Sequence, residues 1–187
     1  ASISTGLMVS LIPHLTASFV KKDMDDVKKK INQTIQWSLF FTIPMTFGLS
    51  VLAKPVWTFF YGVSEFGPSV YQYYVFVALA TTLFTASVTI LQLLKEYKQV
   101  FICLLTGLLT NALLNIPLLY AFHNMGLPAY YGSTTSTILG YFACSYLALR
   151  YIGKKYKISY EETIKRVINI FLITLVMVIC LLIMKYI

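Results

Sequence analysis

Long apolar runs constrain this sequence more than any other feature. A helix needs about 20 predominantly apolar residues to cross about 30 Å of hydrocarbon, and five runs here approach or exceed that length. Because charged or turn-forming residues bound each run, we expect each to cross a membrane once as a helix. A weaker run at 2–20 is expected to form part of a sixth span. The five clear runs cover residues 35–53, 69–94, 99–122, 130–149 and 167–184.

Composition argues against a water-soluble globule. Of the 187 residues, 58% are hydrophobic and only 12% are charged, whereas a soluble domain has about 45–50% apolar and about 25% charged residues. So few polar groups cannot cover so large an apolar excess, which must therefore face lipid. The predicted fold class is all-α, a polytopic transmembrane helix bundle in which residues 1–187 form a single transmembrane domain.

The basic residues predict how the bundle is oriented. Lys and Arg accumulate in the cytoplasmic connections of membrane proteins. If the predicted spans alternate in direction, Lys54 and Lys185 fall on one side and all other basic residues on the other. We therefore expect the loops 21–30, 95–98 and 150–166 to be cytoplasmic. The thirteen basic residues on that side are Lys21, Lys22, Lys28, Lys29, Lys30, Lys95, Lys98, Arg150, Lys154, Lys155, Lys157, Lys165 and Arg166.

Charged and sulfur-containing residues indicate no catalytic, metal or nucleic-acid site. The basic residues stand in short clusters between apolar runs, which disfavours nucleic-acid binding. Cys103, Cys144 and Cys180 are odd in number and show no CxxC spacing, so neither a disulfide framework nor a metal site is indicated. The predicted spans contain no Asp or Glu, and there is no glycine-rich phosphate loop. We therefore expect no cofactor and no enzyme active site.

Uncharged polar residues supply the candidate site instead. One set lies within an arc of about 80° on a single helix face, and it consists of Thr81, Thr85, Thr89 and Gln92. Asn111 and Asn115 form an i,i+4 pair in the next span. Both sets are compatible with the wall of a hydrated cavity and also with hydrogen bonds across helix interfaces. The first interpretation makes all six residues cavity-lining.

Small residues and prolines indicate how the helices pack and bend. Small side chains let helix backbones approach each other, and they form a stripe at Ser133, Thr137, Gly140, Cys144 and Ala148. A proline inside a helix removes a backbone donor and bends the helix. The sequence therefore predicts kinks at Pro13, Pro44 and Pro117. Bent helices suit a transporter that changes shape, although a static bundle can also contain them.

The order of several short motifs resembles a known transporter superfamily. The motifs are LIPHL at 11–15, IPMTFGLSVLAKPVWTFFYG at 43–62, NALLNIPLL at 111–119 and GLPAYYGST at 126–134. Together they are similar to the second half of the lipid flippases of the multidrug/oligosaccharidyl-lipid/polysaccharide exporter superfamily, including its N-x-x-L-x-x-P-L…G pattern. Within that superfamily the chain resembles the MurJ/YtgP branch, the bacterial lipid II flippases.

This resemblance implies the C-terminal lobe of a two-lobed, MATE-like transporter, from about the eighth to the thirteenth of fourteen helices. The N-terminal lobe would be missing from this sequence and would be its main protein partner. The implied activity is alternating access in a bacterial plasma membrane, which carries a polyprenyl-pyrophosphate-linked cell-wall precursor, lipid II, from the cytoplasmic to the outer leaflet. Membrane lipid and the lipid-linked saccharide are the other implied partners, and no cofactor is implied.

Other functions remain compatible with the residues. Polar stripes alone do not select a sugar, so another lipid-linked polysaccharide or a spore-wall precursor is a possible substrate. A drug-efflux transporter is less favoured, because a cation exporter would want negative charge at membrane depth. An integral-membrane enzyme and a passive assembly subunit are two further alternatives outside the transporter class.

Overall fold

The computed structural model describes residues 24–186, and every regular element in that range is a helix. The weaker predicted span at 2–20, which includes Pro13, lies outside the described residues. All-helical architecture confirms the predicted fold class. The helices are α2 (Met24–Val51), α3 (Ala53–Tyr61), α4 (Gly67–Tyr74), α5 (Val77–Leu93), α6 (Tyr97–Asn124), α7 (Tyr130–Tyr156) and α8 (Glu161–Tyr186).

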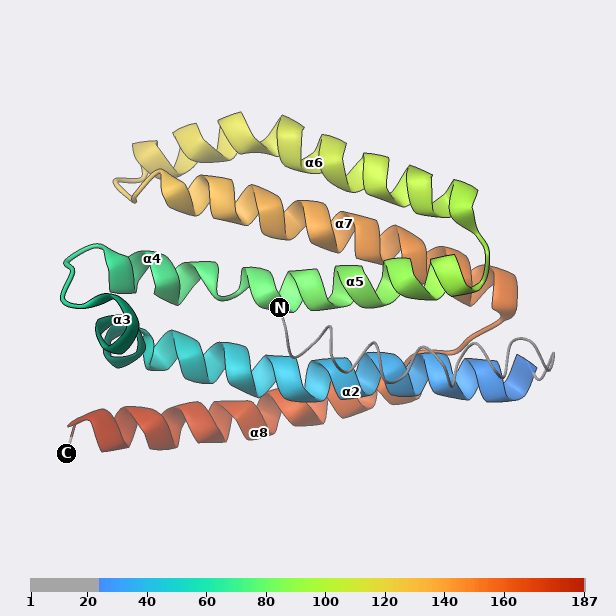
Figure 1. Ribbon diagram of the computed structural model, residues 1–187, viewed down its shortest axis with the longest axis horizontal. Helices are drawn as coiled ribbons and strands as arrows, with labels where there is room; N and C mark the ends of the chain where they lie inside the picture. The colour runs from blue at the N-terminus through green and yellow to red at the C-terminus, as the bar shows by residue number, and fades with distance from the viewer. Residues whose placement is uncertain (1–23, 187) are drawn as a thin grey trace.

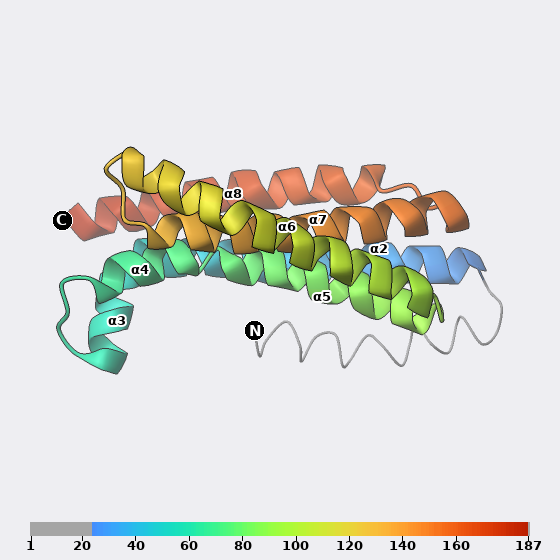
Figure 2. The ribbon, with the colours of Figure 1, turned by 90° about the horizontal axis from the view of Figure 1, so that it is seen from above.

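The long helices run side by side, and their order in space differs from their order in the chain. Neighbouring helices contact one another in the sequence α6, α7, α5, α2, α8 (Figure 1). Helix α7 thus lies between α5 and α6, and α8 packs against α2 at the other edge. Helix α3 turns away from the bundle at the end of α2 (Figure 2). The bend between α2 and α3 is 79°.

Three helical segments of the described chain are long and apolar enough to cross a membrane. They are Gly67–Leu93, which comprises α4 and α5, then Tyr97–Asn124 and Glu161–Met184. The bent pair of α2 and α3 would make a fourth span if it counts as one. Helix α7 is not among them, although its apolar part coincides with the predicted span 130–149. Its serine, threonine and tyrosine residues lower its hydropathy, and its position between two other helices explains how a membrane bundle accommodates them.

The helices extend beyond the predicted spans, which shortens all three predicted loops, and in the loop 95–98 helix α6 already begins at Tyr97. Residues 24–30 form the first turns of α2. The segment 150–166 is mostly the end of α7 and the start of α8, and only 157–160 connects them. Hydropathy does not detect these ends because charged residues form helices readily and pair along them, as Lys28 pairs with Asp25 at 3.0 Å.

Glycines bring the backbones of α6 and α7 together. A Cβ atom on Gly140 would lie 2.8 Å from the carbonyl oxygen of Gly107, and a Cβ on Gly107 would lie 2.9 Å from that of Gly140. The small-residue stripe of α7 is confirmed at Gly140, Cys144 and Ala148, which are buried. It continues through Ser136 and not through the predicted Ser133 and Thr137, which are only half-buried.

A row of hydroxyl groups follows one face of α2. Every fourth residue is a buried serine or threonine, and the row is Thr34, Ser38, Thr42, Thr46 and Ser50. Thr42 shares a hydrogen bond of 3.3 Å with Thr82 of α5, and Ser50 donates to the carbonyl oxygen of Gln72 in α4 at 3.1 Å. Short side chains and these bonds between helices join α2 closely to the segment Gly67–Leu93.

Amide side chains hold the start of α8 against α2. The hydroxyl of Thr163 donates to Asn32 Oδ1 at 2.8 Å and accepts from Gln36 Nε2 at 2.9 Å. Asn32 Nδ2 also donates to the backbone carbonyl of Ser159 at 3.1 Å. Because only 6% of the residues in the apolar part of α8 are buried, these directional bonds fix where the helix begins its contact with the bundle.

Glu96 ties the turn between α5 and α6 to the end of α7. Its carboxylate accepts hydrogen bonds from Lys155, from the Tyr151 hydroxyl at 2.9 Å and from the Tyr156 hydroxyl at 2.8 Å. The bond from Lys155 holds the pKa of the Glu96 carboxyl below its usual value, with the two tyrosines adding to the effect against partial desolvation. The carboxylate thus stays charged over the physiological pH range, and the turn remains attached to α7.

The glycine crossing makes a prediction about stability. Gly140→Ala places a methyl group against the Gly107 carbonyl, so α6 and α7 must separate, and we expect a loss of about 1–3 kcal/mol. Gly48→Ala in α2 is the matched control, because its Cβ would lie 3.6 Å from the flexible end of Met177. That control should be neutral or stabilising by up to about 1 kcal/mol, since alanine favours helix over glycine. Thermal unfolding of both variants in detergent measures the difference, and equal midpoints would contradict the packing argument.

Candidate functional site: a polar pocket between α5, α6 and α7

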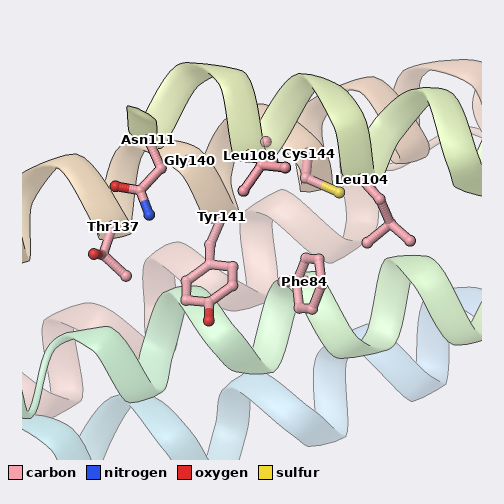
Figure 3. Close-up of a pocket in the computed structure, with 9 residues that line it drawn as sticks. Phe84, Leu104, Leu108, Asn111, Thr137, Gly140, Tyr141 and Cys144 are labelled. Carbon is pink, nitrogen blue, oxygen red and sulfur yellow. The ribbon is translucent and has the colours of Figure 1, made fainter. Parts of the chain in front are cut away.

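A pocket of about 210 Å³ opens between α5, α6 and α7 beside the glycine crossing (Figure 3). Its polar groups are the Asn111 amide, the Thr137 hydroxyl and the Tyr141 phenol. Asn111 comes from α6, whereas Thr137 and Tyr141 lie one turn apart on α7. The residues that line it are Phe84, Leu104, Gly107, Leu108, Asn111, Thr137, Gly140, Tyr141 and Cys144.

Hydrogen bonds fix the polar side of the pocket. The hydroxyl of Ser136, which is fully buried, lies 3.0 Å from Asn111 Oδ1 and 2.8 Å from the carbonyl oxygen of Ser133, so its single proton is shared between these two acceptors. Thr137 also donates to the Ser133 carbonyl, at 3.0 Å. Because Ser136 occupies the amide oxygen of Asn111, the Asn111 NH₂ group remains as a donor that a ligand or water in the pocket could use.

Aromatic rings form the opposite side. Phe84 of α5 lies 4.9 Å from Tyr141, measured between ring centroids. In Figure 3 both rings lie on the α5 side of the pocket, and Asn111 projects from α6 above them. The pocket therefore offers an aromatic surface and several neutral hydrogen-bonding groups at close range.

This arrangement suits recognition of neutral polar groups better than catalysis. No carboxylate, lysine or arginine lines the pocket, and no group of His, Cys, Asp or Glu within the described residues could hold a metal ion. Its volume falls below the range of about 300–1,000 Å³ that is typical of small-molecule sites. On its own it can accommodate one hydroxyl- or amide-bearing part of a ligand, and it cannot enclose a large headgroup.

The structure separates the predicted site residues into two groups. Asn111 lines the pocket, but Asn115 lies one turn away, is half-buried and does not line it. The four polar residues predicted on α5 do not line the pocket either. Thr81, Thr85 and Thr89 are half-buried, and Gln92 is exposed. Thr81 donates to the carbonyl oxygen of Val77 in its own helix at 2.7 Å. A cavity-lining role for these residues stays a prediction.

Sequence reasoning missed Ser136, Tyr141 and Phe84 as parts of this site. Ser136 stands four residues before Gly140, and Asn111 stands four residues after Gly107, so a small or polar residue and a glycine share one face on each helix. That matched spacing is the signal that could have paired the two helices. Phe84 and Tyr141 carry no comparable signal, because aromatic residues are abundant throughout the chain.

The predicted kink sites lie within continuous helices. Pro44 lies inside α2 and Pro117 lies inside α6, and each helix continues on both sides of its proline. The sharp 79° bend falls beyond Pro44, at Leu52 between α2 and α3. Bending at Pro44 and Pro117 therefore stays a prediction.

An all-helical bundle with several apolar segments long enough to cross a bilayer defines this chain as part of a multi-pass membrane protein. The family model described as Lipid II flippase MurJ matches residues 1–187. The chain therefore belongs to the MurJ lipid II flippase family, which confirms the resemblance seen in its motifs.

A curated relative agrees with this assignment. The chain is 31% identical over 180 residues to the Lipid II flippase MurJ of Bacillus subtilis (strain 168). The alignment covers 94% of this chain and 32% of that protein, so the chain spans about a third of the length of this relative. No solved structure matches the chain.

Thiol labelling tests whether the pocket holds water. In a background with Cys103, Cys144 and Cys180 replaced by alanine, a water-soluble maleimide should modify Thr137→Cys faster than Leu113→Cys. Leu113 is 71% exposed but sits on an apolar surface of α6, and only a thiol that ionises in water reacts. Faster labelling at Leu113 would show that the pocket is dry and that its polar groups serve helix packing alone.

Proposed function

We propose that this chain is part of a flippase that moves lipid II from the cytoplasmic to the outer leaflet by alternating access, and that it acts as a transporter and not as an enzyme. The family match over residues 1–187 carries the proposal. The name of the Bacillus subtilis relative supports it. Residues 1–187 would then form one transmembrane domain of a larger, two-lobed protein whose N-terminal lobe lies outside this sequence.

The pocket gives this part of the protein a specific contribution. Lipid II carries sugar hydroxyls and amides, and the free donor of Asn111, the Tyr141 phenol and the Thr137 hydroxyl can hydrogen-bond such groups. The pocket is smaller than a typical ligand site, so this segment would supply one wall of a substrate cavity that other parts of the protein complete. Thr81, Thr85, Thr89, Gln92 and Asn115 would contribute to that wall only in a conformation that exposes their faces to it.

The distribution of charge supports an orientation for the bundle. One end carries the start of α2, the turn between α5 and α6 and the junction of α7 with α8, and the described basic residues other than Lys54 and Lys185 lie at these three places. We propose that this end faces the cytoplasm. A membrane-impermeant thiol reagent added to intact cells should then label Ser64→Cys and leave Asp25→Cys unlabelled. Labelling of both positions, or of Asp25→Cys alone, would refute the orientation.

Complementation tests the transport function. The full-length protein that carries this chain should sustain growth of bacteria depleted of their own lipid II flippase, and precursor should no longer accumulate in the inner leaflet. Failure of a protein that reaches the membrane to do so would refute the proposal.

Two variants of α6 connect this assay to the pocket. Asn111→Leu removes the amide at similar volume, and we expect flipping to slow by up to roughly tenfold, the factor that corresponds to a hydrogen bond of about 0.5–1.5 kcal/mol. Thr106→Val is the control, since Thr106 lies on the same helix outside the pocket and its hydroxyl donates to the Ile102 carbonyl of its own helix, and it should retain activity. Equal activity of the two variants would show that the pocket takes no part in substrate recognition.

A further inference from the structure

A second cavity lies on the other side of α7, in a groove between α7 and α8. Its volume is about 430 Å³, within the range typical of small-molecule sites. Helices α2 and α5 form its floor, with Leu39 and Leu83 among the lining residues. Ile164 and Ile168 of α8 line its side and are 56% and 52% exposed. The groove is therefore open along the surface of the bundle and is not sealed inside it.

The lining of the groove is almost entirely apolar, and its one charged residue stands at one end. Arg150, Tyr160 and Thr163 line the end near the junction of α7 and α8. Leu83 lies ten residues before the end of α5, which places it about 15 Å further along the bundle at 1.5 Å per residue. Ile168 stands seven residues after the start of α8, so the same rise places it about 10 Å from that start along the groove. A charged residue at one end of an apolar groove matches the order of headgroup and acyl chain in a lipid.

Arg150 gives this end of the groove a positive charge that no acidic side chain of the described residues neutralises. Arg150 Nη1 donates a hydrogen bond of 3.4 Å to the Tyr146 hydroxyl. No ion pair within residues 24–186 includes Arg150. Lys154 lies one turn further along α7 and is also exposed, so a second positive charge stands close by. Arg166 differs, because Glu162 pairs with it at 2.6 Å.

We propose that the groove between α7 and α8 binds an anionic phospholipid of the surrounding bilayer, with the headgroup phosphate on Arg150 and one acyl chain along Leu39, Leu83 and Ile168. Basic pockets between transmembrane helices recognise anionic headgroups in this way. The guanidinium of Arg150 presents several donors to phosphate oxygens, and the opening between α7 and α8 admits the lipid sideways from the bilayer. The bound lipid fills the space that α7 and α8 leave unfilled and bridges the two helices.

Lipid retention tests this proposal. The full-length protein is purified in detergent, titrated with phosphatidylglycerol or phosphatidylcholine of the same acyl chains, and examined by native mass spectrometry. We expect the wild type to retain phosphatidylglycerol in preference to phosphatidylcholine. Arg150→Gln should bind phosphatidylglycerol about fivefold more weakly, the factor expected for one basic residue at an anionic surface. Ile168→Trp, which fills the groove, should also reduce retention.

Matched controls separate the groove from general effects of charge and bulk. Arg166→Gln removes a neighbouring positive charge outside the groove, and Ile173→Trp adds the same ring at an exposed position of α8 that does not line it. Both should retain phosphatidylglycerol as the wild type does. Equal retention of the two lipids by the wild type, or unchanged retention in both Arg150→Gln and Ile168→Trp, would overturn the proposal. The second result would also be expected if another segment of the polypeptide fills the groove. Neither result depends on whether the protein transports lipid II.

Discussion

Close contact between the backbones of α6 and α7 is the constraint on which the rest of the bundle depends. Within lipid, apolar burial does not drive helices together, so association relies on packing and on hydrogen bonds between helices. Gly107 and Gly140 remove the side chains that would hold α6 and α7 apart. The same approach places Asn111 within hydrogen-bonding distance of Ser136 and leaves the polar pocket beside the crossing. The pocket is thus a product of the packing geometry.

Much of the fold follows from the sequence because lipid imposes simple requirements on a helix. The apolar runs 99–122 and 167–184 lie within α6 and α8, where apolar residues face outward and hydropathy records them directly. The ends of the helices do not follow, because Lys28 and Arg166 extend helices through pairing with acidic neighbours, which hydropathy counts only as charge. The bend at Leu52 is also not evident, since Pro44 is the stronger local signal.

The candidate site is only partly predictable, for a geometric reason. Asn111 stands out in the sequence because an amide is costly in lipid, but its partner depends on how α6 and α7 are rotated about their axes. The threonines predicted on α5 share a face, yet that face does not border the pocket. Periodicity shows which residues lie together on one helix and does not show which helix they meet. The hydroxyl row of α2 illustrates the same limit, because its four-residue period gives no indication that Thr42 meets Thr82.

Helix α7 connects the features that bear on function. Cys144 lines the neutral pocket and Tyr146, two residues further on, lines the groove toward α8. One turn beyond that, Arg150 lies at the end of the groove near the junction of α7 and α8, and Tyr151 begins the set of bonds to Glu96. Successive faces of one helix therefore contact a hydrogen-bonding pocket, an open apolar groove and an anchored turn. Because packed helices shift as rigid bodies, a rotation of α7 large enough to reshape the pocket would also change the groove and strain the bonds to Glu96.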